Sequence, residues 1–100
     1  AAQNKLKLFE GQAQRKMGDI FLNSGGRGVA KAEKWIQRAI ASDQRNGVMF
    51  ELGQDHALLA AYFKQQGDML QARRCLKQAQ NIFENCGVEL WVKQCQNLAV

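Results

Sequence analysis

The chain has 100 residues, of which 46% are hydrophobic and 23% charged, and it contains no proline. This length corresponds to one domain with its own core, and the apolar fraction is too high for a disordered chain. No apolar run approaches the roughly 20 residues of a membrane-spanning helix, so we expect no membrane association. The formal net charge of +5 permits acidic partners, nucleic acid included, but does not choose among them.

The first half of the chain predicts two helices. Apolar residues spaced by three or four predict one over residues 5–23, namely Leu6, Phe9, Ala13, Met17, Ile20 and Phe21. Gly25 and Gly26 end it, because glycine readily takes the backbone conformations that terminate a helix. The second helix is expected over residues 28–42, with an apolar stripe of Ala32, Trp35, Ile36, Ala39 and Ile40. Residues 43–47 are polar up to a glycine and are expected to form a connection.

The second half predicts three more helices. The third covers residues 48–66 with Phe50, Leu58, Leu59, Tyr62 and Phe63, and Gly53 inside it should cost about 1 kcal/mol relative to alanine. Gly67 ends this helix, and Asp68 with Gln71 forms a capping box at the start of the fourth. The fourth helix is expected to bury Ala72, Cys75, Leu76, Ala79, Ile82 and Phe83, and residues 85–87 close it. A short fifth helix is expected over residues 88–99, with Leu90, Trp91, Cys95 and Leu98.

The chain contains an internal repeat. Ala32, Trp35, Ile36 and Ala39 recur at an offset of 40 (72 minus 32) as Ala72, Cys75, Leu76 and Ala79. Met17, Gly18, Phe21 and Gly25 recur at an offset of 42 (59 minus 17) as Leu59, Ala60, Phe63 and Gly67. The difference falls in the turn between Gly25 and Gly28, where an insertion is tolerated. We therefore expect two helix-turn-helix units, residues 5–43 and 47–85, and a capping helix over residues 88–99.

This pattern resembles the tetratricopeptide repeat. The resemblance is carried by Leu59, Ala60, Phe63, Gly67, Ala72, Leu76 and Ala79 in the second unit, and by Met17, Gly18, Phe21, Gly25, Ala32, Ile36 and Ala39 in the first. The chain departs from the family in lacking the proline that closes each repeat, and its spacing exceeds the roughly 34 residues of the family. The resemblance implies an all-α fold: a right-handed array of antiparallel helix hairpins, with about five helices in one domain over residues 1–100.

The second unit is also similar to the repeats at the C-terminal end of large bacterial ATPase or cyclase-type regulators. This likeness is carried by residues 55–58 (Asp-His-Ala-Leu), Gly67, Asp68, Ala72, Arg73, Gly87 and Trp91. It implies a regulatory domain within a larger protein. The odd number of cysteines, without close pairs, favours reduced thiols and a cytoplasmic location over a disulfide framework.

The resemblance implies a binding function. In tetratricopeptide repeats, the first helix of each unit lines a concave surface that often holds an extended peptide. The matching positions are Gln12, Arg15, Asp19, Leu22, Asn23, Gln54, Ala57, Ala61, Lys64 and Gln65. The lysine-and-asparagine clamp that some members use for a C-terminal carboxylate is not reproduced, because Arg15 and Asp19 stand at two of its positions. We therefore expect a protein–protein interaction module with a peptide or helix in this groove, or else a face that packs against neighbouring repeats of a parent protein.

A second candidate surface is basic. Arg27, Lys31, Lys34 and Arg38 lie four, three and four residues apart, so on a helix they share one face. Such charge runs usually form a solvated face, but this one also offers a patch for phosphates or an acidic protein. No aromatic residue is expected to interleave with it, which argues against stacking on single-stranded bases. Nucleic-acid or anion binding is therefore the alternative to the groove hypothesis.

The sequence shows no constellation for catalysis, a metal or a cofactor. No side chain three or four residues from His56, the sole histidine, could form a catalytic dyad with it. Cys75, Cys86 and Cys95 are widely spaced in the sequence, without the close pairs of a zinc site. Cys75 and Cys95 are expected to pack in the interior, and Cys86 to be the exposed thiol. We therefore expect neither enzyme activity nor a bound metal or cofactor.

Both ends of the array leave alternatives open. Leu6, Leu8 and Phe9 could support a homodimer through the open N-terminal edge. Leu90 and Trp91 either cap the last repeat or form an exposed docking stripe, and capping is the commoner role because a terminal repeat must cover an open core.

Overall fold

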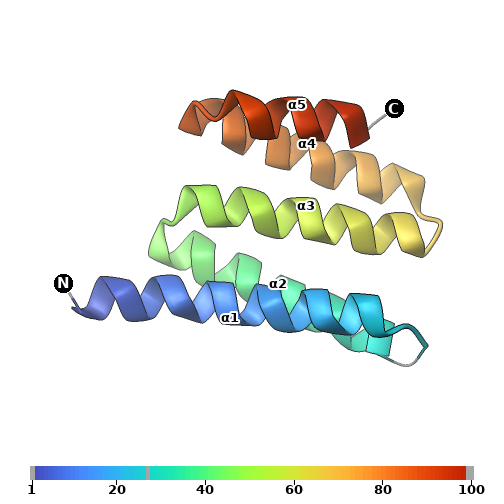
Figure 1. The fold of residues 1–100 in the computed structure, drawn as a ribbon, viewed down its shortest axis with the longest axis horizontal. Coiled ribbons are helices and arrows are strands. Elements are labelled where there is room, and N and C mark those ends of the chain that lie inside the picture. The colour runs from blue at the N-terminus through green and yellow to red at the C-terminus, as the bar shows by residue number, and fades with distance from the viewer. Residues whose placement is uncertain (1, 27, 99–100) are drawn as a thin grey trace.

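The computed structural model describes residues 2–26 and 28–98, with side chains from Phe9 onward. Over these ranges the chain forms five helices and no strand (Figure 1). The helices are α1 (Ala2–Ser24), α2 (Gly28–Asn46), α3 (Met49–Gln65), α4 (Met69–Cys86) and α5 (Glu89–Leu98). The predictions made for Arg27 and for the side chains of Leu6 and Leu8 lie outside the described part.

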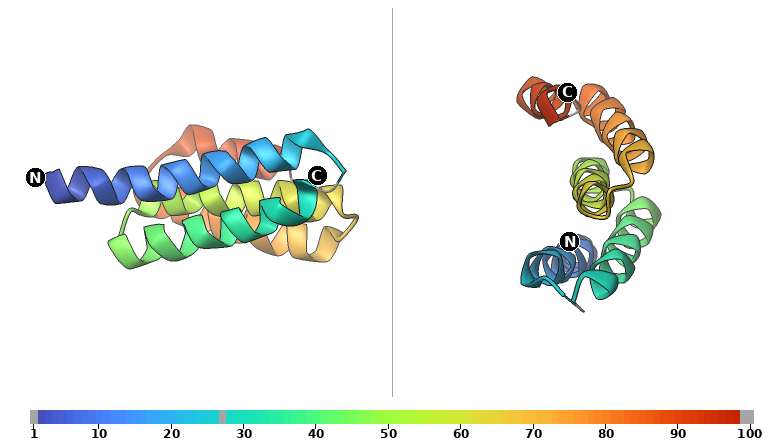
Figure 2. Two further views of the ribbon diagram at one scale, coloured as in Figure 1. Left: turned by 90° about the horizontal axis from the view of Figure 1, so that it is seen from below. Right: turned by 90° about the vertical axis from the view of Figure 1, so that its right-hand side faces the viewer.

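The helices stack as antiparallel hairpins. α1 packs along α2 and α3 along α4, while α2 also packs against α3 and α4 against α5. Figure 2 shows the array end-on as a crescent, with α1, α3 and α5 on its inner side and α2 and α4 on its outer side. An all-helical array of hairpins followed by a fifth helix is therefore confirmed over the described residues.

The second helix is longer than expected. Residues 43–47 were predicted to form a connection, but α2 continues to Asn46 and ends at a glycine with φ of 70°. The additional turn forms because Ser42 and Asp43 are buried against α1. Ser42 Oγ donates to Glu10 Oε1 at 3.2 Å. These contacts with a distant segment override the turn-forming tendency of the polar run, so the prediction of a connection over residues 43–46 was wrong.

The start and end of α4 follow the expected chemistry. Asp68 Oδ1 accepts a hydrogen bond from the backbone N–H of Gln71 at 3.2 Å, which satisfies one of the free donors at the helix start. Gly87 ends the helix in the left-handed conformation, with φ of 74°. An alanine there would be strained, because only glycine takes this conformation without a steric cost.

Small residues let the paired helices approach closely. A Cβ added at Gly18 would lie 2.7 Å from Ile36 Cγ1, and one added at Gly53 would lie 2.6 Å from the ring of Phe83. Phe83 and Ile36 are fully buried at these contacts. The cost of a glycine inside α3 is therefore offset by the approach of α4, which no larger residue at position 53 would permit without a shift of the ring.

The fifth helix caps the second hairpin through an aromatic cluster. The ring centroid of Trp91 lies 5.5 Å from that of Phe50 and 5.4 Å from that of Phe83. Cys95, one turn further on, is 3% exposed, whereas Leu90 is 67% exposed. Trp91 thus has the capping role that the sequence left open, and Leu90 remains a surface residue.

One side of α1 is partly apolar. Phe9 and Ile20, both in the expected stripe of α1, are 58% and 53% exposed because no described helix covers that side. Cys75 is buried and Cys86 is exposed, as expected. None of the helices, within the described residues, combines the length and apolar character needed to cross a bilayer.

Candidate functional site

The inner side of the crescent carries an open groove. It has a volume of about 600 Å³ and lies between α1, α3 and α5. Six of the ten residues predicted for the binding surface line it: Gln12, Arg15, Asp19, Gln54, Ala57 and Ala61. The structure therefore brings together residues from two repeats that are distant in the sequence.

The other predicted residues lie elsewhere. Leu22 is 5% exposed and belongs to the core. The side-chain amide of Asn23 donates to both the carbonyl and the carboxylate of Asp19, at 2.9 and 3.0 Å. Lys64 lines a neighbouring apolar notch, and Gln65 is exposed but lines neither surface. These four residues do not line the groove.

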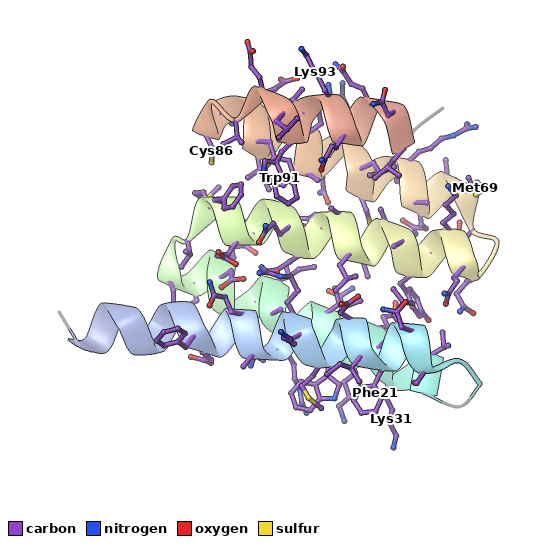
Figure 3. All side chains as sticks on the ribbon, in the orientation of Figure 1. Phe21, Lys31, Met69, Cys86, Trp91 and Lys93 are labelled. Carbon is purple, nitrogen blue, oxygen red and sulfur yellow. The ribbon has the colours of Figure 1, made fainter. Side chains whose placement is uncertain are left out.

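Three further residues line the groove, although the sequence did not predict them there: Lys16, Leu58 and Trp91. Trp91 reaches the groove from α5, and Figure 3 shows it beneath that helix and directed toward α3. The available signal was the internal repeat itself, because α5 corresponds to the first helix of a third unit and so belongs on the same side as α1 and α3.

Arg15 joins α1 to α3 at the base of the groove. Its Nη1 lies 2.6 Å from Glu51 Oε2 and 3.3 Å from Asp55 Oδ1. Gln12 Nε2 donates to the other carboxylate oxygen of Glu51 at 3.2 Å. Because the charge of Arg15 is balanced by Glu51 and its Nη1 also bonds Asp55, Arg15 acts first as a structural link and leaves the groove with little net charge.

Behind this link lies a buried pair of carboxyl groups. Asp43 of α2 and Asp55 of α3 are both 0% exposed, and their carboxyl groups are neighbours that can bond each other only if one of them is protonated. Gly11 of α1 makes room for them, because a Cβ at that position would collide with the Asp43 carboxylate. The pair therefore connects the three helices that surround it.

The two carboxyl groups share a proton at neutral pH. Burial, and then the neighbouring Asp43, raise the pKa of Asp55 from 3.8 to about 9, against the opposing charge of Arg15. Burial also raises the pKa of Asp43. Asp55 Oδ1 accepts from Arg15, whereas Asp55 Oδ2 and both oxygens of Asp43 have no partner among the described residues. We therefore place the proton on Asp55 Oδ2, from which it can be donated to Asp43.

His56 is half-buried behind the groove. Burial lowers the pKa of its imidazole, and its Nδ1 has no hydrogen-bond partner among the described residues. Within the same part of the chain, no three His, Cys, Asp or Glu residues are arranged to hold a metal ion. His56 thus has the character of a neutral packed histidine.

The basic residues of α2 are exposed on the opposite side of the first hairpin. Arg38 lies over the ring of Trp35 at 4.9 Å from its centroid. Lys31 lies over the ring of Phe21 at 5.7 Å from its centroid, and Figure 3 shows both side chains. The expectation that aromatic residues stand apart from this face was wrong. These rings already stack with the protein's own cations.

The described surface therefore carries two candidate sites of different character. One is a nearly neutral groove with a rigid base, and the other is a basic face supported by aromatic rings. No protein-family model, no curated protein and no solved structure matches the chain.

Proposed function

We propose that this chain is a non-catalytic protein–protein interaction module of the tetratricopeptide-like kind, which binds a peptide segment in the groove between α1, α3 and α5. The observation that supports the proposal is the groove itself, which is open, concave and lined from three helices. We further propose that the module belongs to a larger cytoplasmic protein, where it recruits or regulates a partner.

The lining chemistry suits a polypeptide ligand. Ala57 and Ala61 leave room for a peptide backbone to approach α3, and the amide of Gln54 can donate to or accept from it. Lys16 and Asp19 offer charges of both signs on the wall formed by α1. Trp91 supplies an apolar surface on the wall formed by α5. Pockets that bind polypeptides combine such an apolar anchor point with a few polar groups.

The base of the groove is held rigid before a ligand arrives. Arg15 bonds Glu51 and Asp55 at the same time, so α1 and α3 cannot separate without exposing a buried charge cluster. A preformed groove reduces the conformational entropy lost on binding, which favours affinity.

The two tryptophans provide the experiment. Trp91 lines the groove, and Trp35 lies on the basic face. Peptides selected from a random display library against the chain would be titrated into Trp35→Phe, which keeps Trp91, and into Trp91→Phe, which keeps Trp35. We expect the peptide to change the emission of Trp91 alone, with a Kd that rises at least tenfold in the double variant Lys16→Asp/Asp19→Lys.

The matched control also swaps one positive and one negative residue, so the net charge is unchanged, but it does so outside the groove. Lys77→Asp/Glu84→Lys swaps two exposed charges of α4 and should leave the Kd unchanged. Selected peptides that perturb Trp35 and not Trp91, or that bind the groove variant as well as the wild type, would contradict the proposal.

A second candidate function is anion or nucleic-acid binding through the basic face. It is favoured by the stacking of Arg38 on Trp35, which holds one cation in a fixed position. Replacing Arg27, Lys31, Lys34 and Arg38 with glutamine should then abolish binding of a single-stranded oligonucleotide. Its affinity should fall steeply between about 50 and 200 mM salt, by the amount expected for counterion release. Unchanged binding in the glutamine variant would eliminate this function.

A further inference from the structure

The buried carboxyl pair lies where three helices meet. α1, α2 and α3 all pack against one another, and Figure 1 shows them next to one another in the first half of the array. Asp43 comes from α2 and Asp55 from α3, while Gly11 of α1 leaves the space that the Asp43 carboxylate occupies. A change in the charge of this pair therefore acts on the packing of all three helices.

The hydrogen bonds around the pair require a proton. Among the described residues, the only donor to the pair is Arg15 Nη1, which reaches Asp55 Oδ1 at 3.3 Å. Both oxygens of Asp43 and Oδ2 of Asp55 have no donor. Two ionised carboxylates would leave these oxygens buried, unbonded and beside a like charge, whereas one proton supplies a hydrogen bond and removes a charge. The geometry thus favours a pair that holds one proton.

The charges that face the pair come from α1 and α3. Arg15 and Glu10 face it from α1, and Glu51 faces it from α3. On α2, Arg45 is paired with Glu10 at 3.1 Å. Arg15 is therefore the only described cation that acts on the pair, and it is shared with Glu51. A second negative charge on the pair would have no cation of its own.

Arg15 connects the pair to the groove. It lines the groove, while its Nη1 lies 2.6 Å from Glu51 Oε2 and 3.3 Å from Asp55 Oδ1. When Asp55 is protonated, the ionised Glu51 is the stronger partner of Arg15. An ionised Asp55 competes with Glu51, because a charged acceptor forms the stronger hydrogen bond. Since Asp55 is 0% exposed and Glu51 is 9% exposed, this competition draws Arg15 deeper, away from the groove.

We propose that the Asp43–Asp55 pair is a proton-operated latch that sets the position of Arg15 in the groove. With the proton bound, Arg15 stays on Glu51 and joins α1 to α3 at the base of the groove. When the proton passes from Asp55 Oδ2 to solvent water, Arg15 moves inward to Asp55. Repulsion between the two carboxylates then loosens the contact between α2 and α3.

The effect of the latch on a ligand rests on the peptide-binding function proposed above. A peptide that contacts the groove base binds the protonated form more tightly, because only that form keeps Arg15 in place between α1 and α3. Burial and the neighbouring Asp43 raise the pKa of Asp55 to about 9. The affinity should therefore fall as the pH rises towards and through this value, and a bound peptide should in turn strengthen proton binding.

The latch is tested first without a ligand, in the full chain carrying Cys86→Ser so that the exposed thiol does not titrate. NMR records the carboxyl carbon signals of Asp43 and Asp55 and the Nε–H signal of Arg15 between about pH 6 and 10. We expect the Arg15 signal and the backbone amide of Gln54, which also lines the groove, to shift with the same midpoint as the Asp55 carboxyl.

Two isosteric substitutions lock the latch in opposite positions. Asp55→Asn donates to Asp43 and accepts from Arg15, so the Arg15 signal should keep its low-pH position throughout. Asp43→Asn leaves a single carboxyl group that ionises beside Arg15, so the signal should keep its high-pH position. Because the two variants predict opposite positions, either one decides the question if the other fails to fold. The control Asp68→Asn removes an exposed carboxyl group at the start of α4 and should titrate like the wild type.

Peptide binding gives the second readout. The Kd of a peptide selected for the groove should rise at least fivefold between about pH 7 and pH 10 in the wild type, and should change less than about twofold in Asp55→Asn. The latch is refuted by an Arg15 signal that stays constant while Asp55 titrates, by an Asp55 that is ionised at all these pH values, or by the same pH dependence of Kd in Asp55→Asn. Failure to select any groove peptide would contradict the peptide-binding function instead, and the NMR titration would still decide the latch.

Discussion

At the scale of single residues, Asp43 and Asp55 hold one proton between them inside the protein, and this sets the pH dependence of stability. The pKa of Asp55 rises from 3.8 in the unfolded chain to about 9 in the folded protein. The folded state therefore binds the proton more tightly than the unfolded state. Stabilisation from the protonated pair is complete below about pH 4 and is lost as the pH rises towards 9.

We therefore predict that the free energy of unfolding falls between pH 7 and 9, with a slope of at most about 1.4 kcal/mol per pH unit for one proton. This window avoids His56, whose lowered pKa makes the folded state lose stability only as the pH falls below its ordinary 6.5. Urea denaturation at several pH values measures the slope. A flat profile over this window would show that the pair is ionised.

The matching substitution is Asp55→Asn. Its amide can donate to Asp43 while its carbonyl accepts from Arg15, so it reproduces the protonated pair without binding a proton. We expect the variant to be more stable than the wild type by roughly 1–3 kcal/mol at pH 8, with most of the slope removed. Asp19→Asn, at an exposed position, should keep the wild-type slope.

Gly53 gives the second residue-scale prediction. Alanine is the better helix former by about 1 kcal/mol, but its Cβ would press on the fully buried Phe83 ring. We predict that Gly53→Ala destabilises the protein by roughly 1–3 kcal/mol, as measured by thermal and urea unfolding. In the double variant Gly53→Ala/Phe83→Leu, part of the alanine penalty should disappear. Additive effects of the two changes would contradict a direct contact between them.

At the scale of elements, the start of α4 depends on one side chain. Asp68 accepts the hydrogen bond of the Gln71 backbone N–H and sits at a helix N-terminus, where negative charge is favourable. We predict that Asp68→Ala lowers the free energy of unfolding by about 1 kcal/mol. Asp68→Asn should keep most of the stabilisation that the cap provides. Equal losses in both variants would indicate that the charge, rather than the hydrogen bond, supplies the stabilisation.

The sequence predicts elements of this kind well, because their signals are local. Apolar spacing and glycines located all five helices, and Asp68 with Gln71 marked the start of α4. The end of α2 could not be located in this way. Its polar last turn is stabilised because Ser42 bonds Glu10 and because Gly11 leaves room for the Asp43 side chain. Glu10 and Gly11 belong to α1, which is distant in the sequence.

The candidate groove shows the same limit. The repeat pattern identified the inner helices, and six predicted residues do line the groove. The sequence could not show that Arg15 is already paired with Glu51 and Asp55, because ion pairs between helices depend on rotamers and register. Nor could it show that Leu22 belongs to the core, since Leu22 shares a face of α1 with groove residues and its burial depends on which part of that face the neighbouring helices cover.

At the scale of the whole molecule, the described residues leave an apolar edge of α1 uncovered. Phe9 and Ile20 are 58% and 53% exposed and lie about three helical turns apart, which places them on the same side of a helix. Exposed apolar residues aligned in this way favour association with a second apolar surface. The same edge on a second copy of the chain is self-complementary under two-fold symmetry.

We predict a reversible homodimer through this edge, detected by light scattering at increasing protein concentration. The net charge of +5 opposes association, so the dimer should become stronger as salt screens the repulsion between the two copies. Anion binding at the basic face should instead become weaker as the salt concentration rises. Phe9→Glu/Ile20→Glu should yield a monomer at all concentrations. Leu70→Glu/Leu90→Glu makes the same charge change at exposed leucines of α4 and α5 and should leave the dimer intact. A wild-type chain that stays monomeric at high protein and salt concentration would instead mean that α1 has too little apolar surface to hold a second copy.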